Sequence, residues 1–316
     1  MSVLLVIGGL LLLVGGGELL VRGAVGLASA LGVSPLVIGL TVVAFGTSAP
    51  ELVVSLQAVF TGHPDIVLGN VVGSNIANIL LIVGAAAALK TITISPGLVR
   101  RDGSLLMVAT LGFAGICLLG TIGWIAGGGM VLVLIGYTVW SFWAARRRTP
   151  TADPETEEEV PAAPAGIMIA LAITAFGIGG VVVGASLLID GAVDIARWAG
   201  LSEAVIGLTL IALGTSLPEL ATAGMAALRG HSDLAVGNAL GSNLFNMLAI
   251  AGVTAMVSPV PVPPELLRFD LWVMIGVTVA LLIMMTTERR VSRAEGGLLL
   301  TGYVVYITLT VSGIAS

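Results

Sequence analysis

Two glutamates stand inside apolar stretches of the chain, where charge is otherwise rare. Glu51 and Glu219 each have apolar residues on both sides, and neither segment supplies a Lys or Arg close to its glutamate. A carboxylate left alone in a hydrocarbon environment costs about 2.5–3.5 kcal/mol on insertion scales and more on others. A bound cation would compensate this charge, so the two glutamates are candidate cation ligands.

Oxygen-bearing side chains accompany both glutamates at matching distances along the chain. Ser74 and Asn78 stand four residues apart and so share one face of a helix, as do Ser242 and Asn246. Hydroxyl, amide and carboxylate oxygens suit calcium, which takes about 6–8 of them, and they also suit sodium. Zinc or copper would call for His or Cys. The candidate side-chain ligands besides the glutamates are Thr47, Ser48, Ser74, Asn78, Thr215, Ser216, Ser242 and Asn246.

A proline precedes each glutamate. Pro50 and Pro218 lack a backbone donor and obstruct a regular helix around the preceding turn. Carbonyls freed in this way can line a cavity, where irregular backbone is tolerated in membranes. We nominate the carbonyls of Ala44 and Ala212 as further ligands. Ser, Thr and Gly also serve packing alone in membrane helices, which remains the alternative role for each single hydroxyl.

The glutamates belong to two copies of one unit. An offset of 168 residues aligns the two halves without a gap from about residue 35 to 102. Gly46–Leu52 returns as Gly214–Leu220, and Gly69–Asn75 returns as Gly237–Asn243. Chance cannot hold one register over so many polar, Gly and Pro positions, so the chain contains an internal repeat.

The elements that must position these residues are membrane helices. The chain has 316 residues, of which 57% are apolar and only 10% charged, against about a quarter charged in soluble domains. Several apolar runs approach the roughly 18 residues needed to cross a bilayer as a helix. They lack the alternation of apolar and polar residues that is typical of the strands of a β-barrel. We predict an all-α polytopic protein with ten spans near 2–21, 35–60, 66–89, 103–120, 124–145, 166–189, 203–228, 234–257, 269–286 and 295–314.

The ten spans divide into two five-helix repeats, residues 1–145 and 165–316, joined by a polar cytoplasmic linker at 146–164. The N-terminal apolar segment lacks a basic region and is expected to be a retained first span. An odd number of spans per repeat inverts the second copy, as in many secondary transporters that bind substrate near the midplane. With both termini outside, the inner loops hold eleven Lys and Arg residues and the outer loops two, which favours that orientation.

The doubled motifs resemble the alpha repeats of the calcium/cation antiporter superfamily. The resemblance rests on Gly46–Glu51 with Gly69–Asn75 and on their second copies, covers essentially all ten spans, and is greatest with the prokaryotic sodium/calcium exchangers. It implies that the second, third, seventh and eighth helices form a cation-binding core. It also implies that helices one and six slide against this core to give alternating access, with the residues nominated above as ligands.

One position departs from the pattern of the family. Several sodium/calcium exchangers carry Asp at one of the positions held here by Asn78 and Asn246, whereas this chain has an amide at both. With only Glu51 and Glu219 ionised, one calcium ion leaves the site neutral and three sodium ions leave it at +1. The stoichiometry therefore stays open, as does the choice between sodium and protons.

The sequence predicts a multi-pass protein of the cell membrane that exchanges Na⁺ for Ca²⁺ by alternating access, in an electrogenic cycle. A Ca²⁺/H⁺ exchanger, in which the glutamates take up protons as calcium leaves, is the alternative. A cation channel or ion sensor is a different class, less favoured because inverted repeats provide two gates around a fixed site. We expect no enzyme activity, no cofactor, no nucleic-acid partner, contact with membrane lipid, and function as a monomer.

Overall fold

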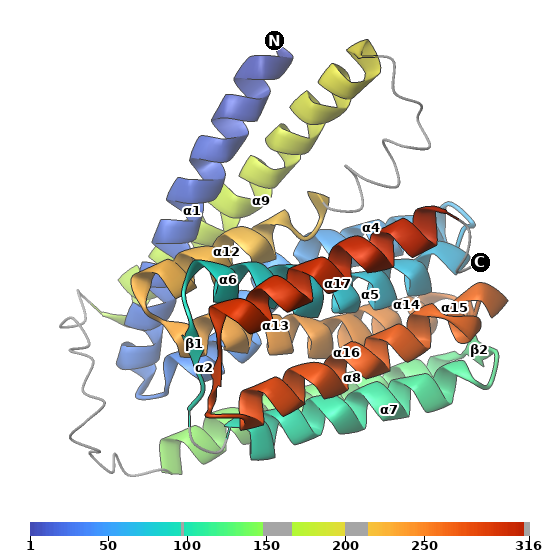
Figure 1. Cartoon of the computed structure of the whole chain (residues 1–316). Coiled ribbons are helices and arrows are strands. Elements are labelled where there is room, and N and C mark those ends of the chain that lie inside the picture. Colours follow the sequence, from blue (N-terminus) through green and yellow to red (C-terminus); the bar gives the residue numbers. More distant parts are fainter. Residues whose placement is uncertain (96–97, 148–165, 200–213, 313–316) are drawn as a thin grey trace.

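The computed structural model describes residues 1–95, 98–147, 166–199 and 214–312, nearly all of them helical (Figure 1). Six helical stretches are long and apolar enough to cross a membrane, and the bent pair Pro35–Thr47 and Ala49–Phe60 adds a seventh if it counts as one span. This confirms the prediction of a multi-pass helical protein. The six are Ser2–Leu31, Ile66–Leu89, Trp124–Ala145, Ile167–Trp198, Ser232–Val257 and Arg293–Val311.

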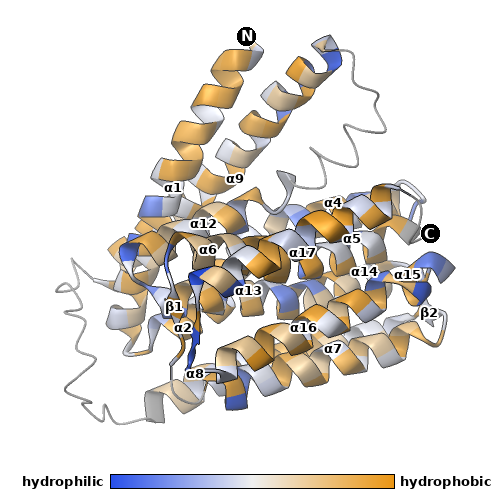
Figure 2. Ribbon diagram, in the orientation of Figure 1, coloured by the Kyte–Doolittle hydropathy of each residue, from blue (hydrophilic) through white to orange (hydrophobic). Residues whose placement is uncertain are grey.

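Further apolar helices are shorter: α7 (Ser104–Cys117) and α16 (Asp270–Thr286). Hydrophobic residues dominate the outer helices, as Figure 2 shows for α1, α9 and α7. Nearly all of the predicted linker at 146–164 lies outside the described residues, as does the first part of the predicted span 203–228.

The helices α1 (Ser2–Leu31) and α9 (Ile167–Trp198) are about ten residues longer than the predicted spans 2–21 and 166–189. Small apolar residues after Arg22 sustain α1 until Gly32, whose left-handed backbone (φ 65°) ends it. The predicted span 2–21 leaves Arg22 in the following loop, which is wrong. Arg22 lies within α1 and pairs with Glu18 at 2.6 Å.

The long helices α1 and α9 lie side by side in antiparallel contact and project away from the remaining helices (Figure 1). Glycines recur every seven residues on both contact faces, and they allow the two backbones to touch. A Cβ atom at Gly16 would come within 2.7 Å of the Gly180 carbonyl carbon, and one at Gly177 within 2.4 Å of the Leu20 nitrogen. The recurring glycines are Gly9, Gly16 and Gly23 on α1 and Gly177, Gly184 and Gly191 on α9.

Two spans form the centre of the molecule. The first consists of α5 (Asp65–Ala77), the π-helix η2 (Asn78–Val83) and α6 (Gly84–Leu89). The second consists of α13 (Ser232–Phe245), the π-helix η5 (Asn246–Ile250) and α14 (Ala251–Val257). Of their apolar windows 72% and 83% are buried, against 28% or less for α1, α8 (Trp124–Arg147), α9 and α17 (Arg293–Val311). These central spans carry Asn78 and Asn246 at the start of their π-helices, a geometry that often marks functional sites.

The predicted break around Pro50 is present. The chain runs through α2 (Pro35–Ile38), the π-helix η1 (Gly39–Val43) and α3 (Ala44–Thr47), leaves helical geometry at Ser48, and resumes as α4 (Ala49–Phe60) at an angle of 43°. In the second half α12 (Leu217–Arg229) likewise begins just after Ser216, with Pro218 in its first turn. Each glutamate thus lies in the first turn after a break.

Short strand pairs join the halves at both ends of the core. Strand β1 (Ile92–Thr93) pairs antiparallel with β4 (Arg290–Val291), and β2 (Thr121–Ile122) pairs with β3 (Val260–Pro261). The repeat offset relates β1 to β3, and an offset one residue longer relates β2 to β4. Each repeat therefore contributes one strand to each pair. The remaining short helices are η3 (Val99–Gly103) and α15 (Pro264–Arg268).

A carboxylate is held by a tyrosine at equivalent places in both halves. Tyr137 of α8 donates its hydroxyl to Asp102 of η3 at 2.9 Å, and Tyr306 of α17 donates to Asp270 at 2.9 Å. Asp102 is fully buried and also pairs with Arg101, while at Asp270 the preceding Phe269 stacks on Tyr306 instead. These bonds connect the last two helical segments of each repeat.

Replacing Tyr137 with phenylalanine is expected to lower the free energy of unfolding by about 1–3 kcal/mol, because Asp102 stays buried with one donor fewer. Cys117 is buried, so a thiol-reactive dye reports thermal unfolding of the purified protein. The matched control is Tyr303→Phe, since the Tyr303 hydroxyl has no hydrogen-bond partner in the described part of the chain. Equal unfolding temperatures for both variants would contradict a stabilising role of the Tyr137–Asp102 bond.

Candidate functional site

The two predicted carboxylates are buried at the centre of the molecule. Glu51 is 2% and Glu219 is 1% exposed, and the two are close enough for their charges to repel. No Lys or Arg of the described ranges pairs with either one. The Oε2 atom of each glutamate is buried and has no hydrogen-bond partner among the described residues. Two buried carboxylates with free oxygens and no basic partner in the described residues are suited to binding a cation.

Hydroxyl groups cross from one repeat to the glutamate of the other. Ser48 donates to Oε1 of Glu219 at 2.8 Å. The Thr215 hydroxyl interacts with Glu51, and its repeat mate Thr47 interacts with Glu219 in the same way. Three of the candidate ligands, Thr47, Ser48 and Thr215, therefore lie beside the two glutamates. The helix breaks make this possible, because they turn these side chains toward the opposite repeat.

The Ala44 carbonyl is not freed by Pro50, contrary to the reasoning from sequence. It accepts the backbone N–H of Ser48 at 3.0 Å, because the helix stays regular up to that residue. The carbonyl that a donor at position 50 would have reached, four residues earlier, is that of Gly46. A carbonyl oxygen has two lone pairs, so Ala44 retains capacity for an ion. Its counterpart Ala212 lies outside the described residues.

The remaining predicted ligands lie on the same broken and central helices. Ser74, Ser216 and Ser242 are buried, with exposed fractions of 8%, 2% and 0%. Within the described part of the chain, Ser242 Oγ has no hydrogen-bond partner, and neither has Oδ1 of Asn246. Together with the two glutamate Oε2 atoms, these oxygens are free to coordinate a cation.

The asparagine side chains form bonds between the repeats. Asn78 donates its Nδ2 to Oδ1 of Asn243 at 2.9 Å, and Asn246 donates its Nδ2 to Oδ1 of Asn75 at 3.2 Å. All four amides are 1% exposed. Asn78 and Asn246 were predicted from sequence, whereas Asn75 and Asn243 were seen only as part of the repeated motif.

Two further asparagines, repeat mates of each other, bond to residues of the first repeat at the site, and their roles were not predicted from sequence. Asn70 donates to the Glu51 backbone oxygen at 3.1 Å and to Ser55 Oγ at 2.8 Å. Asn238, its repeat mate, accepts the Thr47 hydroxyl at 3.3 Å, while its Nδ2 has no partner. Their duplication within the repeat was the available signal.

The chemistry of this site is that of a hard cation. No three side chains of His, Cys, Asp or Glu gather as metal ligands within the described ranges. The buried donors are carboxylate, hydroxyl and amide oxygens, which suit calcium and sodium.

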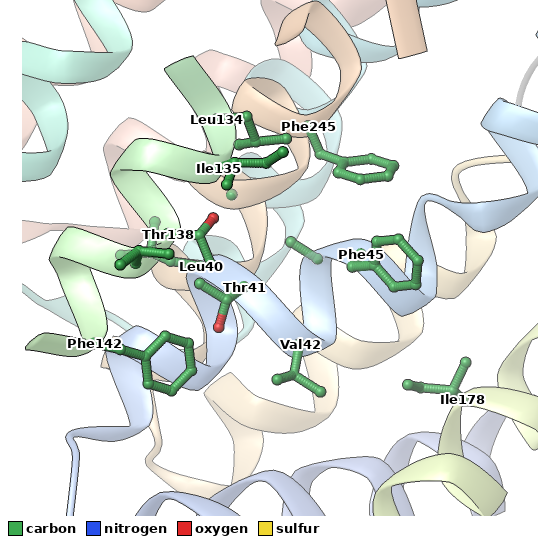
Figure 3. A pocket seen from close by; sticks show the side chains of 13 residues that line it. Leu40, Thr41, Val42, Phe45, Leu134, Ile135, Thr138, Phe142, Ile178 and Phe245 are labelled. Atoms are coloured by element: carbon green, nitrogen blue, oxygen red, sulfur yellow. The ribbon is translucent and has the colours of Figure 1, made fainter. Parts of the chain in front are cut away.

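An apolar cavity of about 550 Å³ lies beside the site, between η1, α8, α9 and α13 (Figure 3). Its lining includes Phe45, Phe142 and Phe245, and the hydroxyl of Thr41 on its wall already donates to the Val37 carbonyl at 2.6 Å. A cavity so poor in free oxygens cannot hold a dehydrated cation. The candidate ion site is therefore the buried cluster around the glutamates and not this cavity.

Comparisons with known proteins agree with this chemistry. The family described as sodium/calcium exchanger protein matches residues 1–143 and 169–312. The putative antiporter CaxA of Alkalimonas amylolytica is 39% identical, over 96% of this chain and 97% of its own length. The sodium/calcium exchanger MaX1 of Methanosarcina acetivorans is 32% identical, over 97% of both chains.

A solved structure extends the agreement to the fold. The sodium-calcium exchanger NCX_Mj, soaked with 2.5 mM Na⁺ and 1 mM Sr²⁺, superposes with a TM-score of 0.84 at 30% identity, over 97% of each chain. Sequence and fold agree along the whole length, and these relatives are transporters and not enzymes. This chain is therefore a multi-pass membrane protein of the sodium/calcium exchanger family, within the calcium/cation antiporter superfamily.

Proposed function

We propose that this protein exchanges sodium for calcium across the cell membrane by alternating access. The observation that carries the proposal is the pair of buried, duplicated glutamates, each with an oxygen that has no partner in the described ranges. Antiport of calcium against another cation follows from the family, and the names of MaX1 and NCX_Mj as sodium/calcium exchangers support sodium as that cation. The proposed ligands are the side chains of Glu51, Glu219, Thr47, Ser48, Ser74, Asn78, Thr215, Ser216, Ser242 and Asn246, with the carbonyls of Ala44 and Ala212.

The formal charge of the two glutamates suggests how much net charge crosses the membrane in each transport cycle. Two glutamates balance one calcium ion, whereas three sodium ions would leave an excess of +1. Exchange of three sodium ions for one calcium ion would then be electrogenic. Calcium entry would move one net positive charge outward and would be favoured by an inside-positive potential.

The proposed architecture is ten spans in two inverted repeats, residues 1–145 and 165–316, with a cytoplasmic linker at 146–164. The strand pairs, the two Asp–Tyr bonds and the crossed asparagines all recur at the repeat offset or one residue beyond it, which supports this division. We propose that both termini lie outside, because Lys and Arg residues concentrate in the loops that this orientation places inside. The substrates are Ca²⁺ and Na⁺, without a cofactor, and we propose that the protein acts as a monomer.

Uptake of calcium-45 into proteoliposomes tests the exchange. We expect rapid uptake with an outward sodium gradient and none with an outward proton gradient or with no gradient. Clamping the membrane with valinomycin and potassium at inside-positive potential should raise the final accumulation about tenfold per 60 mV for one net charge. A channel would instead conduct calcium without any exchanged ion.

The alternative is exchange of calcium for protons by the same two glutamates. Two protons would replace one calcium ion, so the cycle would be electroneutral and indifferent to the potential. Uptake driven only by the proton gradient would establish this alternative. Uptake under neither gradient would contradict calcium antiport altogether.

A further inference from the structure

Four buried asparagines form two hydrogen bonds that cross between the repeats. Asn78 stands at the start of η2 and donates to Asn243 of α13, and Asn246 stands at the start of η5 and donates to Asn75 of α5. The two bonds are repeat mates of each other, because Asn75 corresponds to Asn243 and Asn78 to Asn246. Such a pattern in both copies points to a role at the centre of the site.

An asparagine amide can coordinate a cation only through its oxygen. Its oxygen is a ligand, whereas its NH₂ group carries partial positive charge and repels the ion. In Asn78 and Asn246 the nitrogen is committed to a partner oxygen, so the remaining end of each amide is the oxygen. For Asn246 this Oδ1 atom is buried, and no described residue donates a hydrogen bond to it.

The partner amides, those of Asn75 and Asn243, are themselves held so that their oxygens point toward Asn246 and Asn78. Asn243 Nδ2 reaches the backbone oxygen of Asn75 at 3.4 Å, and Asn75 Nδ2 contacts Met274 Sδ of α16 at 3.6 Å. These contacts occupy the nitrogen ends of Asn75 and Asn243. Their oxygens are then available to accept the NH₂ groups of Asn246 and Asn78.

We propose that Asn75 and Asn243 are positioning residues, which orient Asn246 and Asn78 so that amide oxygens and not NH₂ groups face the transported cation. This inference rests on the proposed function, since it assigns roles within the same calcium site. It divides the four amides into two that face the ion and two that set their orientation. The orientation of each facing amide depends on a residue of the opposite repeat.

Equilibrium binding of calcium-45 to the purified protein tests this division with double-variant cycles. Asn75→Leu keeps the size of the side chain and removes the acceptor, and we expect it to weaken calcium binding about tenfold. Asn246→Ala removes the amide that Asn75 orients. If Asn75 acts through Asn246, the double variant binds no more weakly than Asn246→Ala alone, within about twofold.

The matched control pairs Asn75→Leu with Asn78→Ala, since Asn78 is held by Asn243 and not by Asn75. In this double variant the two losses in calcium affinity are expected to multiply. A purely structural role of Asn75 would multiply the losses in both combinations and would overturn the inference. Asn243→Leu provides the mirror experiment, coupled to Asn78→Ala and independent of Asn246→Ala, and it decides the matter if Asn75→Leu does not fold.

The wild-type protein separates this inference from the function on which it rests. Absence of calcium binding by folded wild-type protein would contradict the proposed function itself. Wild-type binding together with multiplying losses in every cycle would overturn only the roles of Asn75 and Asn243. The roles are supported if the losses in calcium affinity multiply only in the control pairs, Asn75→Leu with Asn78→Ala and Asn243→Leu with Asn246→Ala.

Discussion

Replacing either Glu51 or Glu219 with glutamine is expected to reduce calcium uptake into proteoliposomes by about 100-fold or more. Each carboxylate is buried, and in the proposed complex each faces the ion with a free oxygen. Removing one partner of a buried charge pair costs about 3–5 kcal/mol, which corresponds to a loss in affinity of two to three orders of magnitude. Glutamine keeps the size and one oxygen, so the variant isolates the charge.

The control for this prediction is Glu265→Gln, which removes a carboxylate from the exposed start of α15. It should transport calcium at the wild-type rate.

The two glutamine variants are expected to lose transport to the same extent. Each glutamate interacts with a hydroxyl of the opposite repeat, Glu219 with Ser48 and Glu51 with Thr215. Calcium uptake near the wild-type level in either glutamine variant would show that the glutamate concerned is not a ligand.

Replacing Gly177 with leucine is expected to abolish transport or prevent accumulation of folded protein. A Cβ atom there would lie 2.4 Å from the Leu20 nitrogen and 2.5 Å from its Cα, so α1 would have to move away from α9. Overpacking of this kind typically costs about 1–3 kcal/mol, and more where backbone is in the way. Membrane expression, thermal unfolding and calcium-45 uptake together measure the effect.

Gly179→Leu is the matched control, two residues along the same helix. A Cβ atom at Gly179 has no heavy atom within 4 Å, so a side chain there meets open space. This variant should fold and transport as the wild type does. Equal behaviour of the two leucine variants would contradict the close glycine contact between α1 and α9.

The repeat offset made much of the site predictable. Matching Glu51 with Glu219 and Asn78 with Asn246 required only the register of the two halves, and the structure brings both glutamates together with Thr47, Ser48 and Thr215. The proline also predicted the helix break. Which repeat supplies the partner of each side chain could not be predicted, because pairing across an internal two-fold depends on how the halves pack.

Other features required the structure because they depend on three-dimensional packing. The length of α1 was underestimated, because the predicted span ends before Arg22 whereas the helix continues to Gly32. Ala44 was nominated for a carbonyl freed around Pro50, but that carbonyl accepts the backbone N–H of Ser48. The orienting role of Asn75 was hidden, because sequence does not show which end of an amide is engaged.

The central claim is that calcium and sodium share one site between Glu51 and Glu219. Equilibrium binding of calcium-45 to the purified protein at increasing sodium chloride, with choline chloride keeping the ionic strength constant, tests it most directly. Sodium is expected to raise the apparent Kd for calcium steeply while the number of sites stays the same, whereas choline is expected to leave the Kd unchanged. Calcium binding indifferent to sodium, or a sodium effect that persists unchanged in Glu51→Gln and Glu219→Gln variants that still bind calcium, would contradict this claim.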